Sequence, residues 1–296
     1  MSFALHHPTS VAAATQLARQ LGQDVRFLAG GTDLLIQIHR RQQTPRHLIA
    51  LDRLGLAAIV EHAEEWSIGA LATHKSIESH PAFQVGALIA LSEAARVVGG
   101  HQVRNIGTIG GNVANASPAA DLLPPLLVLD ATLDLAGPDG MRAVALPEFL
   151  HGQRQTDRAF DEIVTTIRFA KPSPRSATAF LKSGRRKAME IALVSVAARL
   201  TLNAAGRCQD VRIALGAVAP LAMRAAAAEQ LMEAGRPDDD RLRAAGHSAA
   251  VLATPISDVR ASAEYRRRLV ETLVPRTLRL CLDRIAQEAA PSSTSN

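Results

Sequence analysis

The fold is decided by a short glycine-centred stretch, Leu28-Ala29-Gly30-Gly31-Thr32-Asp33-Leu34-Leu35. Residues 25–29 form an apolar run typical of a buried strand, and Thr32 and Asp33 are of the types that begin helices. The paired glycines between them permit positive φ and a close approach of the backbone to a ligand. Successive N–H groups can then point at one cluster of oxygens, with added attraction from the helix dipole. The stretch therefore predicts a strand, a turn and a helix that together bind an anionic group.

A second glycine pair lies in residues 101–121, which are rich in Gly, Asn and Ser. A single Gly-Gly pair is in most cases an ordinary turn, but two such loops in one domain could clamp a pyrophosphate from both sides. The chain contains neither G-x-G-x-x-G nor G-x-x-x-x-G-K-[ST], which excludes the Rossmann and P-loop solutions. The second loop reads Thr108-Ile109-Gly110-Gly111-Asn112, is reached through Val103-Arg104-Asn105-Ile106-Gly107, and continues to Ala116-Ser117-Pro118-Ala119-Ala120-Asp121.

The order of the strands and helices expected along the rest of the chain argues for α+β architecture both before and after the predicted domain boundary. Thr9 or Ser10 can cap an amphipathic helix that Gly22 ends. The proline-containing segment 171–174 is the predicted domain boundary. Before it, strands are expected at 47–51, 66–70, 131–136, 141–146 and 162–168, and helices at 11–21 and 87–97. After it, strand-like runs at 177–182, 189–202 and 209–217 precede helices at 223–234, 238–253 and 265–289.

The composition is that of an ordinary globular protein. Of 296 residues, 47% are hydrophobic, 21% are charged, and the net charge is +5. The basic residues are scattered among 28 acidic ones and only 3% of residues are aromatic, so no nucleic-acid partner is expected. The chain starts without the pattern of a secretory signal and has no apolar run near the roughly 20 residues of a membrane span. We therefore expect a cytoplasmic protein without membrane contact.

The two cysteines, Cys208 and Cys281, belong to no C-x-x-C motif. Two lone thiols are typical of a reducing compartment. With so few thiols the chain cannot by itself hold an iron–sulfur cluster or a cysteine-rich zinc site. No metal ligand is predicted.

The two loops resemble those of the FAD-binding (medium) subunits of molybdenum hydroxylases, the family of xanthine dehydrogenase and carbon monoxide dehydrogenase flavoproteins. The shared motifs are A-G-G-T/H-x-L-L at 29–35, T-I-G-G-N at 108–112 and A-S-P-x-x-D at 116–121. Beyond the boundary the resemblance continues through Phe180-Leu181-Lys182 and Glu190-Ile191-Ala192-Leu193-Val194, with Glu190 standing where relatives often have Asp. The motifs in this order are far more specific than any one of them.

This resemblance implies an α+β fold with a PCMH-type, vanillyl-alcohol-oxidase-like FAD-binding domain and a smaller α+β C-terminal domain with an antiparallel sheet and helices. The FAD-binding domain would span residues 1–172, in two subdomains at about 1–52 and 53–172. The C-terminal domain, of the carbon monoxide dehydrogenase flavoprotein type, would span 176–288, and residues 289–296 would be a flexible tail.

The resemblance also implies which residues contact FAD. The two loops would hold the pyrophosphate, and Asp121 would bond to the ribityl chain or a nearby hydroxyl. Lys182 would lie near the isoalloxazine ring, where a positive charge favours the reduced, anionic flavin; an exposed lysine at a strand end is the alternative. No catalytic residue is predicted. The expected cofactor-binding residues are Leu28, Ala29, Gly30, Gly31, Thr32, Asp33, Leu34, Val103, Arg104, Thr108, Ile109, Gly110, Gly111, Asn112, Ser117, Asp121 and Lys182.

The function implied by the resemblance is electron transfer within a larger oxidoreductase. The organic substrate, expected to be xanthine or a related N-heterocycle, would be hydroxylated at a molybdopterin cofactor on a large subunit. Electrons would pass through [2Fe-2S] clusters on a small subunit to FAD here, and leave to NAD or else to a quinone, oxygen or a carrier protein. The expected assembly is a dimer of heterotrimers. Two alternatives stay open: a self-sufficient FAD-dependent oxidase or reductase of the same superfamily, and a cofactor-free interaction protein.

Overall fold

The computed structural model describes residues 3–186, 189–233 and 235–289. The chain divides into two compact units that are interleaved along the sequence. Unit 1 consists of Met1–Ser76, Gly100–Ser117 and Asp130–Lys171, and unit 2 consists of Ile77–Gly99, Pro118–Leu129 and Pro172–Asn296. Both glycine loops therefore belong to unit 1.

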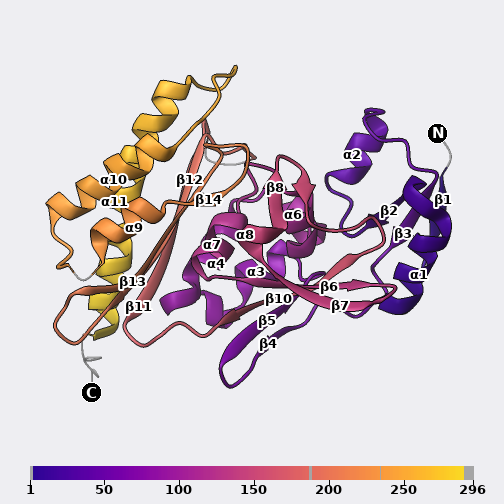
Figure 1. Cartoon of the computed structure of the whole chain (residues 1–296), viewed down its shortest axis with the longest axis horizontal. Coiled ribbons are helices and arrows are strands. Elements are labelled where there is room, and N and C mark those ends of the chain that lie inside the picture. The colour runs from indigo at the N-terminus through magenta and orange to yellow at the C-terminus, as the bar shows by residue number, and fades with distance from the viewer. Residues whose placement is uncertain (1–2, 187–188, 234, 290–296) are drawn as a thin grey trace. The chain divides into compact units, whose positions relative to one another are not determined.

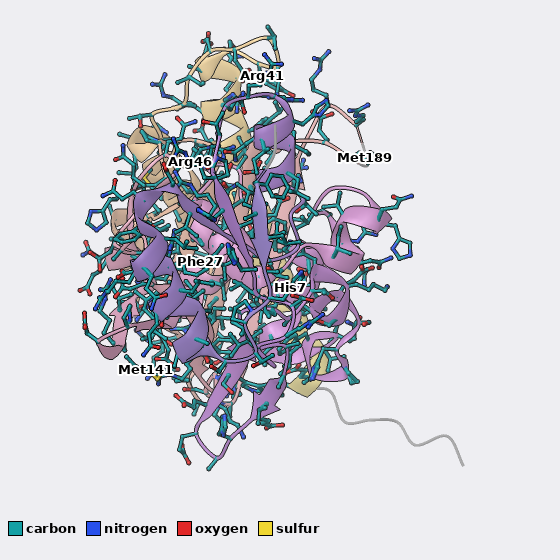
Figure 2. All side chains as sticks on the ribbon, turned by 90° about the vertical axis from the view of Figure 1, so that its right-hand side faces the viewer. His7, Phe27, Arg41, Arg46, Met141 and Met189 are labelled. Carbon is teal, nitrogen blue, oxygen red and sulfur yellow. The ribbon has the colours of Figure 1, made fainter. Side chains whose placement is uncertain are left out.

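Unit 1 begins with a small parallel sheet that leads into the first loop. Its three strands pair in the order β1-β3-β2, with Phe27 opposite Ile49. Helix α1 forms as the sequence predicts, because the Ser10 side chain caps its first turn and Gly22, at φ 71°, ends it. Figure 2 shows α1 and these strands in the foreground, with Phe27 labelled among them. The bounds are β1 (Ala4–His6), α1 (Val11–Leu21), β2 (Val25–Leu28), α2 (Leu34–His39) and β3 (His47–Ala50).

The rest of unit 1 is built on a five-stranded antiparallel sheet in the order β4-β5-β10-β6-β7 (Figure 1). The strands expected at 131–136 and 141–146 form a hairpin, and Gly137 pairs with Gly140 where the chain turns. The strands are β4 (Ile59–Glu61), β5 (Glu65–Gly69), β6 (Thr132–Gly137), β7 (Gly140–Ala145) and β10 (Ile163–Ala170), with a separate pair β8 (Leu150–Gly152) and β9 (Gln155–Thr156). The helices are α3 (His74–Ser79), which begins in this unit, α5 (His101–Ile106), α6 (Ile109–Asn115) and α8 (Leu146–Phe149).

Unit 2 is built on a four-stranded antiparallel sheet in the order β11-β12-β13-β14. Two-residue alternation sends Ala177, Val196 and Ile213 into an apolar core with the C-terminal helices, whereas Lys182 points to the opposite face. Figure 1 shows α9, α10 and α11 on one side of this sheet and α4 and α7 on the other. The bounds are α4 (Ile89–Arg96), α7 (Leu123–Val128), β11 (Ser176–Ser183), β12 (Val194–Leu202), β13 (Cys208–Gly216), β14 (Met223–Arg224), α9 (Ala226–Met232), α10 (Asp239–Leu252) and α11 (Ala263–Ala289).

Several elements differ from the sequence-based expectation. The glycine-rich stretch after His101 contains two short helices, α5 and α6, rather than loop alone. The apolar run around Pro124 and Pro125, for which no element was predicted, is helix α7, with its prolines in the first turn, where a missing N–H breaks no hydrogen bond. The strand expected from 189 begins at Val194, and the helix expected from 223 is preceded by β14.

Within the described ranges, no helix is both long enough and apolar enough to cross a membrane. The predicted tail at 289–296 lies outside those ranges except for Ala289, which ends α11. The predicted domain and subdomain boundaries stay a prediction.

Candidate functional site

The two glycine loops lie against each other in unit 1. A Cβ atom added to Gly30 would lie 1.9 Å from the carbonyl oxygen of Ile106, just before the second loop. That distance is far below van der Waals contact, so the two backbones lie closer together than a residue with a Cβ atom would allow. The tertiary structure thus joins two segments that are far apart in the sequence.

The first loop leaves its backbone donors free. Among the described residues, no group accepts a hydrogen bond from the N–H groups of Gly30, Gly31, Thr32 or Asp33. Gly31 lies at φ 69°, the left-handed region that favours glycine. Four consecutive free N–H groups suit a ligand with several negatively charged oxygens.

The second loop is different, because the backbone donors of its residues 109–112 are already used. The N–H groups of Ile109 and Gly110 donate to the carbonyl oxygens of Ala72 and Ala70 at 2.9 and 2.8 Å. The N–H of Gly111 donates to the Thr108 hydroxyl at 3.1 Å, and that of Asn112 to the Thr108 carbonyl at 3.0 Å. The hypothesis of two backbone loops that both point free N–H groups at a pyrophosphate is therefore wrong for the second loop. From residues 109–112, what this loop can offer a ligand is side chains.

The glycine at 110 is needed for packing and not for its φ. Gly110 lies inside α6, and its φ is not positive. A Cβ there would lie 2.5 Å from Cβ of Ala70, so only glycine lets α6 pack against the chain after β5. Gly111 is exposed, and a Cβ there would meet only the Thr108 hydroxyl at 3.0 Å.

Arg154 connects the first loop to the helix that carries the second, and no pattern in the sequence pointed to it. Its Nη1 donates to Oδ2 of Asp33 and to Oδ1 of Asn115, each at 2.9 Å. The backbone N–H of Arg154 donates to the carbonyl oxygen of Ala116. Both residues have positive φ, at 58° for Arg154 and 44° for Ala116. Gln37 also donates to Asp33, so the side chain of Asp33 is held from two sides.

His74 is a second residue that sequence reasoning missed. It is 3% exposed, and a Cβ on Gly107 would lie 3.0 Å from its ring. Burial, together with the charge of Arg104, lowers the pKa of His74 to about 4, so the imidazole is neutral at pH 7. Its Nδ1 atom has no hydrogen-bond partner within the described chain. The ring therefore packs against Gly107, the residue directly before the second loop.

In unit 2, Lys182 and Asp121 form a buried ion pair. Lys182 Nζ lies 2.7 Å from Asp121 Oδ2 and 3.1 Å from the carbonyl oxygen of Val97. The lysine side chain is 10% exposed, so the alternative of an exposed lysine at a strand end is wrong. Burial raises the pKa of Asp121 to about 6, although the charge of Lys182 and its hydrogen bond oppose this. Both residues were predicted to bind FAD, but nothing in the sequence indicated that they contact each other.

Two orphaned oxygens test whether the predicted residues fit a flavin dinucleotide. The Oδ1 atoms of Asn112 and Asp121 are buried and find no donor among the described residues. A buried acceptor without a donor is costly. Hydroxyl groups, such as those of a ribityl chain, would satisfy such acceptors, and the free N–H groups of the first loop suit phosphate oxygens. Taken unit by unit, the residues present therefore fit parts of FAD: the first loop and Asn112 in unit 1, and Asp121 in unit 2.

The other predicted residues lie close to these groups in the chain. Leu28 ends β2, Ala29 begins the first loop, and Leu34 begins α2. The Val103 carbonyl accepts a hydrogen bond from the Gly107 N–H at 2.7 Å, and Ser117 is partly buried after the end of α6. Their contact with a cofactor stays a prediction.

Comparison with known proteins identifies the family of this chain. Residues 1–172 match the FAD binding domain in molybdopterin dehydrogenase, and residues 178–280 match the CO dehydrogenase flavoprotein C-terminal domain. The chain is 32% identical to the xanthine dehydrogenase FAD-binding subunit of Escherichia coli O157:H7, over 92% of this chain and 94% of that protein. It is 33% identical to the carbon monoxide dehydrogenase medium chain of Afipia carboxidovorans, over 94% of this chain and 96% of that protein.

A solved structure of carbon monoxide dehydrogenase from Hydrogenophaga pseudoflava contains a chain of the same fold. It matches with a TM-score of 0.92 and 33% identity, over 96% of this chain and 98% of that chain. Fold and loops thus define an FAD-binding flavoprotein with an α+β C-terminal domain, and the predicted fold class is confirmed. The chain belongs to the FAD-binding medium subunits of the molybdenum hydroxylase family, which includes xanthine dehydrogenase and carbon monoxide dehydrogenase.

Proposed function

We propose that this chain is the electron-transfer subunit of a three-subunit molybdenum hydroxylase. It receives electrons from [2Fe-2S] clusters on a small partner subunit and passes them to an acceptor, with NAD as the first candidate. The organic substrate, xanthine or a related N-heterocycle, is oxidised at a molybdopterin cofactor on a large partner subunit. The assembly is a cytoplasmic dimer of heterotrimers, in which residues 1–172 form the FAD-binding domain and residues 176–288 the C-terminal domain.

The observation that carries this proposal is the set of four free N–H groups at Gly30–Asp33, packed against the entry to the second loop. Bound FAD supplies reversible redox chemistry, and the protein supplies its position and electrostatic surroundings. The first loop binds the pyrophosphate through its N–H groups, and Asn112 accepts a hydrogen bond from a hydroxyl group. Asp121 accepts a further hydrogen bond from a hydroxyl group with its free Oδ1. Its Oδ2 pairs with Lys182, whose fixed positive charge stabilises negative charge on the flavin.

The relatives support a subunit role over the alternatives. Those named above are a FAD-binding subunit and a medium chain, and the similarity runs through residues 178–280 to the C-terminal domain of CO dehydrogenase flavoproteins. A self-sufficient oxidase or reductase would need its own substrate pocket and proton-handling groups beside the flavin. A cofactor-free protein would not need an FAD-binding domain.

The test is flavin absorbance in a stopped-flow instrument. Loaded with FAD and mixed with xanthine, the isolated chain should show no bleaching, whereas addition of the iron–sulfur and molybdenum subunits should produce it. NADH should bleach the isolated chain if NAD is the acceptor. Bleaching of the isolated chain by the organic substrate would overturn the electron-transfer proposal, and no response to NADH would overturn only the choice of NAD.

A further inference from the structure

Helix α2 and the turn after it carry a cationic surface in unit 1. Residues 34–46 contain no Asp or Glu, whereas Arg40, Arg41 and Arg46 are positively charged. Arg46 Nε lies 3.4 Å from Asp24 Oδ2, but Arg40 and Arg41 are exposed and pair with no carboxylate among the described residues. Figure 1 shows α2 projecting past strands β2 and β3, and Arg41 is labelled in Figure 2. Two cations on this surface are therefore free to meet an anionic group of another molecule.

The same helix also exposes apolar side chains. Leu35 and Ile36 are 43% and 49% exposed, whereas Ile38 is buried. Ile36 and Arg40 are four residues apart and so lie on the same side of the helix. A cation at the C-terminal end of a helix is favourable because it faces the negative end of the helix dipole, but this effect does not explain exposed leucine and isoleucine. Apolar groups with charged groups around them are typical of protein–protein interfaces.

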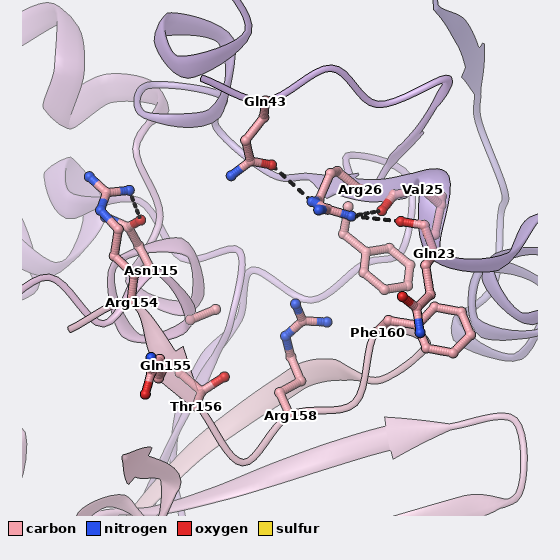
Figure 3. Close-up of a pocket in the computed structure, with 12 residues that line it drawn as sticks. Gln23, Val25, Arg26, Gln43, Asn115, Arg154, Gln155, Thr156, Arg158 and Phe160 are labelled. Atoms are coloured by element: carbon pink, nitrogen blue, oxygen red, sulfur yellow. Dashed lines mark hydrogen bonds between the residues drawn. The ribbon is translucent and has the colours of Figure 1, made fainter. Parts of the chain in front are cut away.

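Side-chain hydrogen bonds hold this helix and turn in place. The Gln37 amide donates to the Asp33 carboxylate, and the Gln43 amide donates to the side-chain oxygen of Gln37 at 2.7 Å. Gln43 in turn accepts a hydrogen bond from Arg26 Nε on β2 at 2.9 Å (Figure 3). The helix and turn are thus tied both to the first loop and to the sheet. A surface that is already ordered loses little conformational freedom when a partner binds, which favours a stable complex.

Charge and position together indicate the partner. Free arginines attract an acidic surface, and they disfavour a symmetric contact with a second copy of this chain, which would bring like charges together. Helix α2 begins directly after Asp33, the last residue of the first loop, so a protein seated on α2 lies beside the proposed FAD site. Of the two partner subunits in the proposed assembly, the iron–sulfur subunit delivers electrons to FAD and must therefore lie close to it.

We propose that Leu35, Ile36, Arg40 and Arg41, here called the α2 surface, dock an acidic face of the iron–sulfur subunit. The inference rests on the proposed function, which supplies the identity of the partner. The apolar pair packs against apolar groups of that subunit, and the two guanidinium groups pair with its carboxylates.

The first test measures assembly. The flavin-loaded chain is titrated into the purified complex of the iron–sulfur and molybdenum subunits, and the dissociation constant is measured by calorimetry at low and at high salt. Arg40→Glu and Arg41→Glu should each weaken binding about tenfold at low salt, because each opposes like charges, and less at high salt, which screens them. Ile36→Ser should weaken binding about tenfold at both salt concentrations, because its effect is loss of apolar contact.

Arg276→Glu is the matched control, because Arg276 is an exposed arginine on α11 of unit 2 and has no ion pair within the described ranges. It changes the net charge by the same amount as Arg40→Glu and should bind as wild type does. Unchanged binding in Arg40→Glu and Arg41→Glu would overturn the docking assignment. An equal loss in Arg276→Glu would also overturn it, since total charge would then control assembly.

The ratio of flavin to protein absorbance separates docking from cofactor binding. Arg40→Glu, Arg41→Glu and Ile36→Ser should keep the wild-type ratio. Loss of flavin in these variants would overturn the docking assignment, because α2 would then act through the first loop. A wild-type chain that does not bind the complex of the other two subunits would overturn the proposed function itself.

A cross-link identifies the docked subunit. Residues 34–46 contain no lysine, so Arg41→Lys introduces one amine there and keeps the charge. In the assembled three-subunit complex, a carbodiimide joins an amine to a carboxylate that it contacts. Mass spectrometry should find residue 41 joined to an Asp or Glu of the iron–sulfur subunit. A link to the molybdenum subunit or to a second copy of this chain, or no link, would overturn the choice of partner.

Discussion

Lys182 Nζ lies 2.7 Å from Asp121 Oδ2, and the two side chains are only 10% and 7% exposed. Lys182 is on β11, and Asp121 directly precedes the N-cap of α7, so the pair ties the sheet of unit 2 to one of its helices. A buried charge without its partner is strongly destabilising. Two residues that family resemblance assigns to the flavin are thus also each other's structural partners.

Lys182→Met should lower the free energy of unfolding by about 3 kcal/mol at pH 8, because it leaves a buried carboxylate without its counter-charge. Lys182→Met combined with Asp121→Asn should recover part of this loss. Urea denaturation of the flavin-free chain measures both. Lys171→Met is the control, since Lys171 pairs with Glu61 at the same 2.7 Å but with side chains 34% and 54% exposed. It should cost less than about 1 kcal/mol, and equal costs for Lys171 and Lys182 would show that burial of the pair is unimportant.

The stability of the chain should depend on the titration of Asp121. Its pKa in the folded state is raised from 3.8 to about 6, so the folded protein binds this proton more tightly than the unfolded chain. The contribution to stability is therefore full below about pH 4 and is lost as the pH rises through 6. The difference between 3.8 and about 6 corresponds to at most about 3 kcal/mol.

Asp121→Asn isolates this effect, because the amide does not titrate while the other acidic groups still do. Between about pH 4 and pH 7, the wild type should lose stability relative to Asp121→Asn, as measured by urea denaturation at each pH. A stability difference that stays constant over this range would contradict the raised pKa.

Gly31→Ala should lose FAD, whereas Gly22→Ala should keep it. Both glycines have φ near +70°, so each substitution strains the backbone by about 1–2 kcal/mol. At Gly22 an added Cβ meets nothing within 4 Å, but at Gly31 it lies 2.9 Å from the Leu35 side chain and 3.2 Å from that of Leu28. The first loop should therefore shift only in Gly31→Ala. The ratio of flavin to protein absorbance after purification reports the outcome, and a full complement of FAD in Gly31→Ala would refute the role of this loop.

Thr108→Val should loosen the second loop, because the Thr108 hydroxyl accepts the Gly111 N–H at 3.1 Å and caps α6. Loss of an N-cap hydrogen bond costs about 1 kcal/mol, which should lower the melting temperature by about 2–4 °C. Thr108→Ser retains the oxygen and should melt close to wild type. Equal melting temperatures for the Val and Ser variants would mean that the cap contributes nothing.

Local patterns in the sequence were enough to predict most helices and long strands. Helix α1 follows from Ser10, Gly22 and a 3.6-residue apolar period, and strand β11 follows from alternation over Ala177–Lys182. These signals depend only on residues that are neighbours in the chain. Strand β1 has three residues, too few for a period to be visible, and it forms because β3 pairs with it in parallel.

The first loop was predicted correctly as strand, turn and helix, but the second was not. Paired glycines in residues 108–112 suggested a loop with free N–H groups. In the structure they lie in α6, where carbonyl groups of Ala70 and Ala72 and both oxygens of Thr108 take up the donors. The same dipeptide thus serves ligand access at Gly30-Gly31 and close packing at Gly110.

The sequence alone determined the family resemblance, the α+β class and the residue types that suit FAD, because motif order and local periodicity are properties of the amino-acid sequence and need no tertiary contacts. Only the tertiary structure decided which of those residues have free hydrogen-bonding groups. Whether a backbone N–H or a carboxylate oxygen is satisfied depends on atoms from distant segments, as with Lys182 and Asp121 or Arg154 and Asp33.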